Sequence, residues 1–207
     1  MAAPTVGGGA RNRGHRTMTL ATIANDYIAR FRAYAAAEMK YYATQPSLSE
    51  AIRLAALSRT PHGKRHPHQR RIPRRVLEAA EQRLQGVSAS LRRARSFDEV
   101  HRLITSNIGS LRGIGELAIY DIAHRIGAFL GCEPDAVYLH AGTRVGARAL
   151  NLTGNVISLS ALPPALHCLS AAEIEDCLCI YKPILKPGKT GRTSRSLCIK
   201  VKSPDCH

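Results

Sequence analysis

Hydrophobic residues recur at steps of three and four along most of the chain, the spacing that places them on one face of an α-helix. No useful stretch alternates hydrophobic and polar residues as a half-buried strand would, and one short extended piece is expected at 136–139. The sequence therefore predicts an all-α fold, a compact multi-helix domain. The expected helices cover residues 20–42, 48–57, 74–91, 97–107, 116–130, 143–150 and 172–182.

Helix boundaries and domain organisation follow from local signals. Prolines at positions 61, 67 and 73 prevent a regular helix between two of the expected helices. Residues 1–18 are rich in glycine, alanine and arginine, so we expect a disordered basic leader before a helical domain over 19–181 and a basic tail over 182–207. Three helices begin with the capping-box pattern: Ser47 with Glu50, Ser96 with Glu99, and Ser170 with Glu173.

Positive charge is concentrated in separate parts of the chain. The net charge is +15, and residues 59–75 hold seven Lys or Arg, three His and no acid. Residues 182–202 hold another seven Lys or Arg without an acid. This distribution favours a polyanion, and nucleic acid is the first candidate. The lack of Trp argues against a stacking platform for single strands. Alternatively, the basic segments only keep the protein soluble. The predicted phosphate contacts here are Lys64, Arg65, Arg70 and Arg71.

Composition also excludes some classes of protein. No run approaches the ~18 apolar residues of a membrane span, and the first ten residues lack the pattern of a secretion signal. Five of the six cysteines lie beyond residue 160 without a paired CxxC, so we expect reduced thiols and no metal. We predict a monomeric cytoplasmic protein, in a bacterial-type cytosol or nucleoid, with no membrane association and no cofactor.

A Gly-x-Gly turn directly precedes the expected helix at 116–130. Gly113 and Gly115 bracket Ile114, and such glycines let the backbone bend tightly while the first amides of the helix point outward. Those amides and the helix dipole suit a phosphate, and Arg112 adds a side-chain cation beside them. A Gly-x-Gly turn also commonly just closes a loop.

The stretch 110–118, SLRGIGELA, with a capped helix before it, resembles the helix-hairpin-helix motif, here at about 97–130. In that motif the hairpin grips a DNA phosphate through backbone amides in a sequence-independent way. Arg112 stands where the motif usually has proline. The resemblance implies that the partner is double-stranded DNA and that Arg112, Gly113, Ile114 and Gly115 contact it.

More loosely, the chain resembles the all-α base-excision DNA glycosylases that carry this motif, and among them small prokaryotic enzymes that excise modified bases from phage DNA. The family's VDTHVxR segment corresponds to 137–144, VYLHAGTR, which keeps valine, histidine and Arg144 but lacks the catalytic aspartate. Leu117 stands where bifunctional members place a lysine. The resemblance therefore implies a monofunctional enzyme that hydrolyses an N-glycosidic bond and leaves an abasic site, without lyase activity.

A helical wheel suggests what replaces the missing acid. Leu117, Asp121 and His124 recur at three- and four-residue steps opposite the apolar face, so Asp121 lies one turn beyond the family's lysine position. We predict Asp121 and His140 as the catalytic pair, with Asp121 near the anomeric carbon and His140 protonating the base or orienting a water. The predicted pocket residues are Leu117, Tyr120, His124 and Tyr138.

Two alternatives stay open. Asp121 can instead pair with Arg125 four residues later, while His140 merely caps the helix that follows it. The whole chain can also be a helix-hairpin-helix protein that holds DNA without any chemistry.

Overall fold

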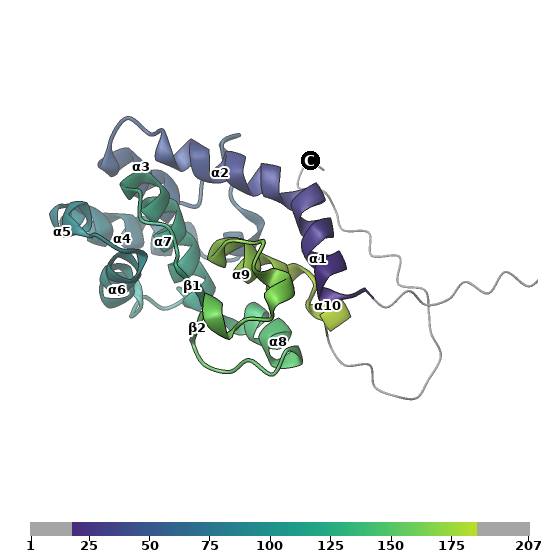
Figure 1. The fold of residues 1–207 in the computed structure, drawn as a ribbon. Helices are drawn as coiled ribbons and strands as arrows, with labels where there is room; N and C mark the ends of the chain where they lie inside the picture. The colour runs from purple at the N-terminus through teal and green to yellow at the C-terminus, as the bar shows by residue number, and fades with distance from the viewer. Residues whose placement is uncertain (1–17, 186–207) are drawn as a thin grey trace, which may run out of the picture.

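A computed structural model describes residues 18–185, so nearly all of the predicted leader and of the predicted basic tail lies outside the described residues. The all-α prediction is confirmed, because helices dominate this part of the chain and its sheet has two short strands (Figure 1). No helix within 18–185 is both long and apolar enough to cross a bilayer.

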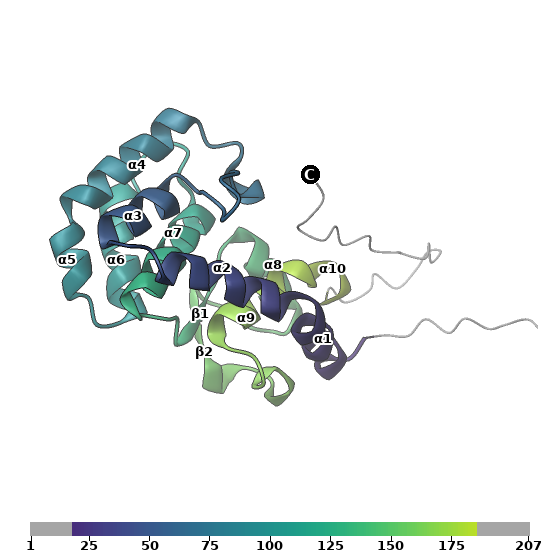
Figure 2. The ribbon, with the colours of Figure 1, turned by 90° about the horizontal axis from the view of Figure 1, so that it is seen from above.

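The described chain begins with a long helical arm. Helix α1 (Leu20–Tyr27) continues through a π-helical segment (Ile28–Arg32) into α2 (Ala33–Ala43), and the Thr19 side chain caps its start. Figures 1 and 2 show α1 beside α9 and α10, whereas α2 runs over α7. The arm therefore joins two groups of packed helices.

The first group, the α3–α7 cluster, surrounds α7. This helix packs against α2, α3 and α6 and buries an almost continuous apolar face. The helix expected over 74–91 is broken at Val87, whose backbone leaves the helical region at φ −111° and ψ 16°. The bounds are α3 (Leu48–Ala56), α4 (Arg74–Gly86), α5 (Ser88–Arg93), α6 (Phe97–Ile108) and α7 (Glu116–Leu130).

The second group, the α8–α9 cluster, has its own hydrophobic core, to which α1 contributes. Its strands pair antiparallel with Val137 opposite Ile157, and the second strand was not expected from the sequence. Gly146 packs so closely on α9 that an added Cβ would lie 2.3 Å from the Leu178 carbonyl oxygen. The bounds are β1 (Ala136–Tyr138), α8 (Ala141–Ala149), β2 (Val156–Ser158), α9 (Ala171–Ile180) and α10 (Lys182–Leu185).

The basic segment between α3 and α4 is irregular, as its prolines predict, apart from one 3-10 turn (Pro67–Gln69) and a bridge between Arg59 and Arg65. Two of its polar side chains are buried, His66 and Gln69. These side chains anchor the segment to the helices beneath it, which positions its arginines.

Candidate nucleic-acid interface

The turn between α6 and α7, residues 109–115, is compact and exposed. The Ile114 amide donates to the Leu111 carbonyl oxygen at 3.0 Å, and the Ile114 side chain is buried in the core. Gly113 has φ +104°, which a residue with a Cβ rarely adopts. Gly115 precedes α7 with nothing within 4 Å of the place where a Cβ would stand. Gly113 is therefore required by its backbone conformation, whereas Gly115 leaves the space beside the first amides of α7 open.

Some backbone amides at the start of α7 and in the turn before it have no acceptor in the described part of the chain. Within residues 18–185, the amides of Gly113, Gly115 and Glu116 donate to no protein acceptor. Gly115 supplies no side-chain cap, and the 15-residue helix that follows directs the positive end of its dipole at the turn. Open amides and a helix dipole together can hold an anion at this point.

Arginines from α4, from α8 and from the turn itself lie around residues 109–115. Arg83 on α4 donates to the Asn107 carbonyl oxygen and to Ser110 Oγ, both at 3.1 Å. Arg112 within the turn is exposed. The guanidinium of Arg144 on α8 binds both carboxylate oxygens of Glu116, at 2.6 and 2.9 Å. The predicted contact Arg144 is therefore next to the turn, with part of its charge offset by Glu116.

The basic segment reaches the same region. Gly113 lies beside Val76 at the start of α4, with 4.0 Å between Val76 Cγ1 and the place of an added Cβ. The chain enters α4 directly from this segment. Arg65 donates to the Ile72 carbonyl oxygen at 3.0 Å, whereas the other predicted phosphate contacts, Lys64, Arg70 and Arg71, are exposed.

The predicted catalytic pair is not brought into direct contact. Asp121 accepts a hydrogen bond from Gln69 and lies 3.9 Å from the Arg125 guanidinium, with 17% of its side chain exposed. His140 is buried and forms a capping box with Thr143 at the start of α8. The structure thus contains both the Asp121–Arg125 pair and the His140 cap, which the sequence offered as the alternative to a catalytic role.

His140 has a second partner that the sequence did not indicate. Its Nε2 is hydrogen-bonded to the Glu175 carboxylate, from α9. Burial raises the pKa of Glu175 to about 7 against the opposing effect of His140, and Asp176 and Asp121 raise it further. Burial also raises the pKa of Asp176, which accepts a hydrogen bond from Tyr27 at 3.0 Å. The Asp121 carboxylate of α7 therefore acts electrostatically on the two acids of α9.

A polar network holds the basic segment against α2 and α7. Glu38 lies 3.4 Å from His66 Nε2 and 3.7 Å from Arg125 Nε, and His66 also contacts the Tyr42 hydroxyl at 3.0 Å. Burial and the nearby Arg125 lower the pKa of His66 to about 3, so this imidazole is neutral. Arg125 Nη1 is buried without a hydrogen-bond partner in the described chain. This network connects Asp121, through Arg125, with the basic segment.

The predicted pocket residues pack mainly against aromatic rings. Tyr120, His124 and Tyr138 lie with their ring centroids 5.9, 6.4 and 5.0 Å from that of Phe97, and Leu117 is half-buried. Burial lowers the pKa of His124 to about 4.

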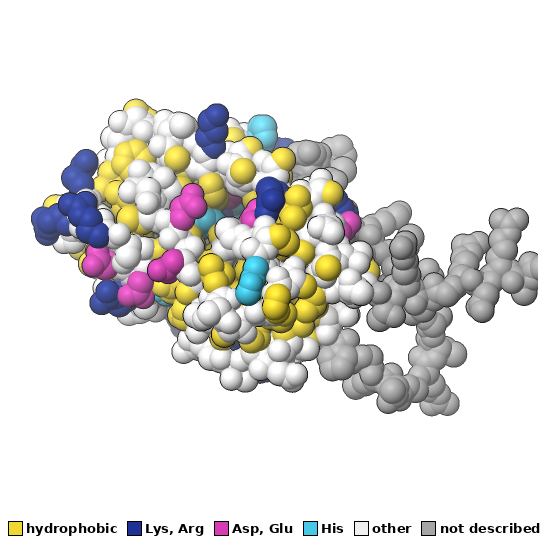
Figure 3. Space-filling view, viewed as in Figure 1, with side chains coloured by type: hydrophobic (Ala, Val, Ile, Leu, Met, Phe, Trp, Pro, Cys, Tyr) yellow, Lys and Arg dark blue, Asp and Glu magenta, His cyan; other side chains and the backbone are white. Residues whose placement is uncertain are grey.

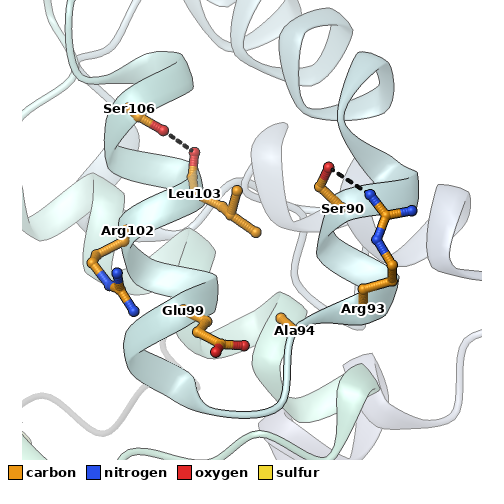
Figure 4. A pocket seen from close by; sticks show the side chains of 7 residues that line it. All are labelled: Ser90, Arg93, Ala94, Glu99, Arg102, Leu103 and Ser106. Carbon is orange, nitrogen blue, oxygen red and sulfur yellow. Dashed lines mark hydrogen bonds between the residues drawn. The ribbon is translucent and has the colours of Figure 1, made fainter.

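The surface hollow between α5 and α6 is separate from the predicted catalytic residues. It has a volume of about 500 Å³, and in Figure 4 Arg93 of α5 and Arg102 of α6 stand on its two sides. Lys and Arg side chains gather on the surface at the α5 end of the molecule (Figure 3). Neither Asp121 nor His140 lines this hollow.

Sequence reasoning missed Gln69, Glu175 and Asp176. The one available signal was the pair of acids inside the otherwise apolar run of α9, because charged residues on a buried face usually have a partner. Comparison with protein-family models, curated proteins and solved structures finds no significant match.

Proposed function

We propose that the protein binds duplex DNA by gripping a backbone phosphate at the 109–115 turn, with α6 and α7 acting as a helix-hairpin-helix. The observation that carries this proposal is the exposed turn itself, where unpaired amides begin a 15-residue helix. Arg83, Arg112 and Arg144 surround the turn and supply positive charge.

Such contacts read the backbone and not the base edges, so binding is nearly independent of sequence. The apolar side chains of the turn pack on the core, Ile114 buried and Leu111 half-buried, and neither carries a polar group that could read a base. The exposed arginines of the basic segment extend the contact along the phosphates.

The decisive test replaces Gly115 with valine. A Cβ at this position would meet nothing within 4 Å, so we expect the fold to be retained, whereas the valine side chain should block the close approach of a phosphate to the amides. We expect Gly115→Val to weaken binding to a short duplex about tenfold or more, measured by fluorescence anisotropy. Gly86→Val is the matched control, because a Cβ at Gly86 on α4 also meets nothing within 4 Å. Equal affinity of the two variants would remove the turn from the interface.

As a second candidate function, we propose monofunctional excision of a damaged or modified base. The observation that favours it is the buried hydrogen bond between His140 and Glu175, where burial and the nearby charges of Asp176 and Asp121 raise the pKa of Glu175. A carboxylate there can stabilise the positive charge that develops on a sugar as its base departs, and a group with a pKa near 7 can transfer a proton.

This candidate predicts that DNA carrying modified bases loses the free base and becomes cleavable by alkali, while the untreated strand stays intact because Leu117 offers no amine. Asp121→Asn keeps the shape and removes the charge, so it should lower base release at least 100-fold and leave duplex binding nearly intact. Asp135→Asn, at an exposed site, is the control. If no modified substrate yields an abasic site while binding stays strong, the protein holds DNA without chemistry.

A further inference from the structure

A second surface hollow lies beside the 109–115 turn. It has a volume of about 300 Å³ and opens between α8 and the loop that leads into β2. Arg144 and Arg148 line one side, and Thr153, Gly154 and Asn155 line the other. Of these residues, Arg144 was predicted from the sequence to contact DNA.

The charge in this hollow is only partly offset. Arg144 and Arg148 are four residues apart on α8, so their guanidinium groups share one face of the helix and repel each other. Glu116 and the Asn155 side-chain oxygen, at 3.2 Å, hold Arg144. Within residues 18–185, the Arg148 side chain makes no hydrogen bond or ion pair and is exposed. An anion in the hollow would relieve this repulsion.

The opposite wall suits a small anion. Thr153 brings a hydroxyl donor and Asn155 a side-chain amide. Gly154 has φ +122°, a conformation that would strain a residue with a Cβ. Because glycine has no side chain, an anion can approach the backbone closely at this position. Two cations facing polar donors across a narrow opening form a typical phosphate site.

The position of the hollow identifies the source of the phosphate. Glu116, which binds Arg144, directly follows Gly115, so the hollow begins within one side-chain length of the turn amides. A DNA strand carries a phosphate about every 3.4 Å along the helix axis. A strand seated on the turn therefore brings a neighbouring phosphate to the hollow.

We propose that this hollow binds a neighbouring phosphate on the DNA strand that the 109–115 turn grips, with Arg148 as the main cationic contact and Arg144 shared between that phosphate and Glu116. The inference rests on the proposed function and adds a second bound phosphate on the same DNA strand. Two bound phosphates on one strand would set the direction in which the duplex crosses the protein.

The test uses the full chain and a short duplex across a series of salt concentrations. We expect Arg148→Ala to weaken binding about fivefold to tenfold at low salt and to lower the slope of log affinity against log salt by about one. Glu116→Gln removes a competing carboxylate and releases Arg144, so it should tighten binding. Arg30→Ala is the control, because Arg30 is an exposed arginine on the N-terminal arm.

Duplexes with a single neutral methylphosphonate locate the contact. For the wild type, one linkage adjacent to the turn-bound phosphate should lower affinity, and the same linkage should have no further effect on Arg148→Ala, as expected for a coupled pair. If Arg148→Ala matches Arg30→Ala while Gly115→Val weakens binding, the hollow is not a phosphate site and the proposed function stands. If Gly115→Val also has no effect, both inferences fail.

Discussion

At the scale of single residues, His140 shows how one side chain can serve two roles. Its backbone amide and Nδ1 are used in the cap of α8, whereas its Nε2 faces the Glu175 carboxylate. The cap fixes the orientation of the ring, so the ring presents one nitrogen to α9. The pairing therefore fixes α8 relative to α9 through a polar contact inside an otherwise apolar interface.

Glu175 makes the stability of this interface depend on pH. Its pKa rises from an ordinary value of 4.5 to about 7 in the fold, so the folded state binds the proton more tightly than the unfolded chain. The contribution of protonated Glu175 to the free energy of unfolding is fully present below pH 4.5. It is lost as the pH rises through about 7, and the loss amounts to about 3 kcal/mol.

Glu175→Gln cannot ionise and should escape that loss. Urea unfolding of both proteins at pH 5 and pH 8 should show the variant gaining stability relative to the wild type at the higher pH. Subtracting the two curves cancels the titration of groups that do not contact Glu175, such as His66 and His124. A stability difference that is the same at both pH values would contradict this prediction.

At the scale of elements, the α8–α9 contact depends on Gly146. A Cβ at this position would lie 2.3 Å from the carbonyl oxygen and 3.0 Å from the carbonyl carbon of Leu178, both of them backbone atoms that cannot rotate away. We expect Gly146→Ala to lower the free energy of unfolding by about 2 kcal/mol or more, because the two helices must separate.

Gly86→Ala, on α4, is the matched control for Gly146→Ala. It introduces the same methyl group at the end of α4, where nothing lies within 4 Å, and alanine is the better helix former. Thermal unfolding of both variants should therefore separate the effect of close packing from that of helix propensity. Similar melting temperatures would mean that α8 and α9 have room to adjust.

At the scale of the whole molecule, net charge governs the proposed DNA binding. With a net charge of +15, the protein should release many counterions from the duplex, so we expect affinity to fall about 1,000-fold between 50 and 200 mM salt. Replacing Arg70 and Arg71 together by glutamine should lower the salt slope by about two, since both are exposed and in the basic segment. Titration at several salt concentrations measures both effects, and a flat response would exclude a phosphate-dominated interface.

The sequence by itself determined the helices, because their signals are local. Periodic apolar positions, the serine caps of α3, α6 and α9, and the prolines of the basic segment act within a few residues, so each can be read without knowing the fold. The exposed glycine turn before α7 was readable for the same reason.

The tertiary structure alone decided which polar groups meet. Glu175 is 35 residues from His140, Gln69 is 52 from Asp121, and Asp176 is 149 from Tyr27. The break at Val87 and the pairing of β2 with β1 were likewise invisible in the sequence. Such contacts depend on how helices pack, and packing is set by side chains that are distant along the chain, so no local pattern encodes them.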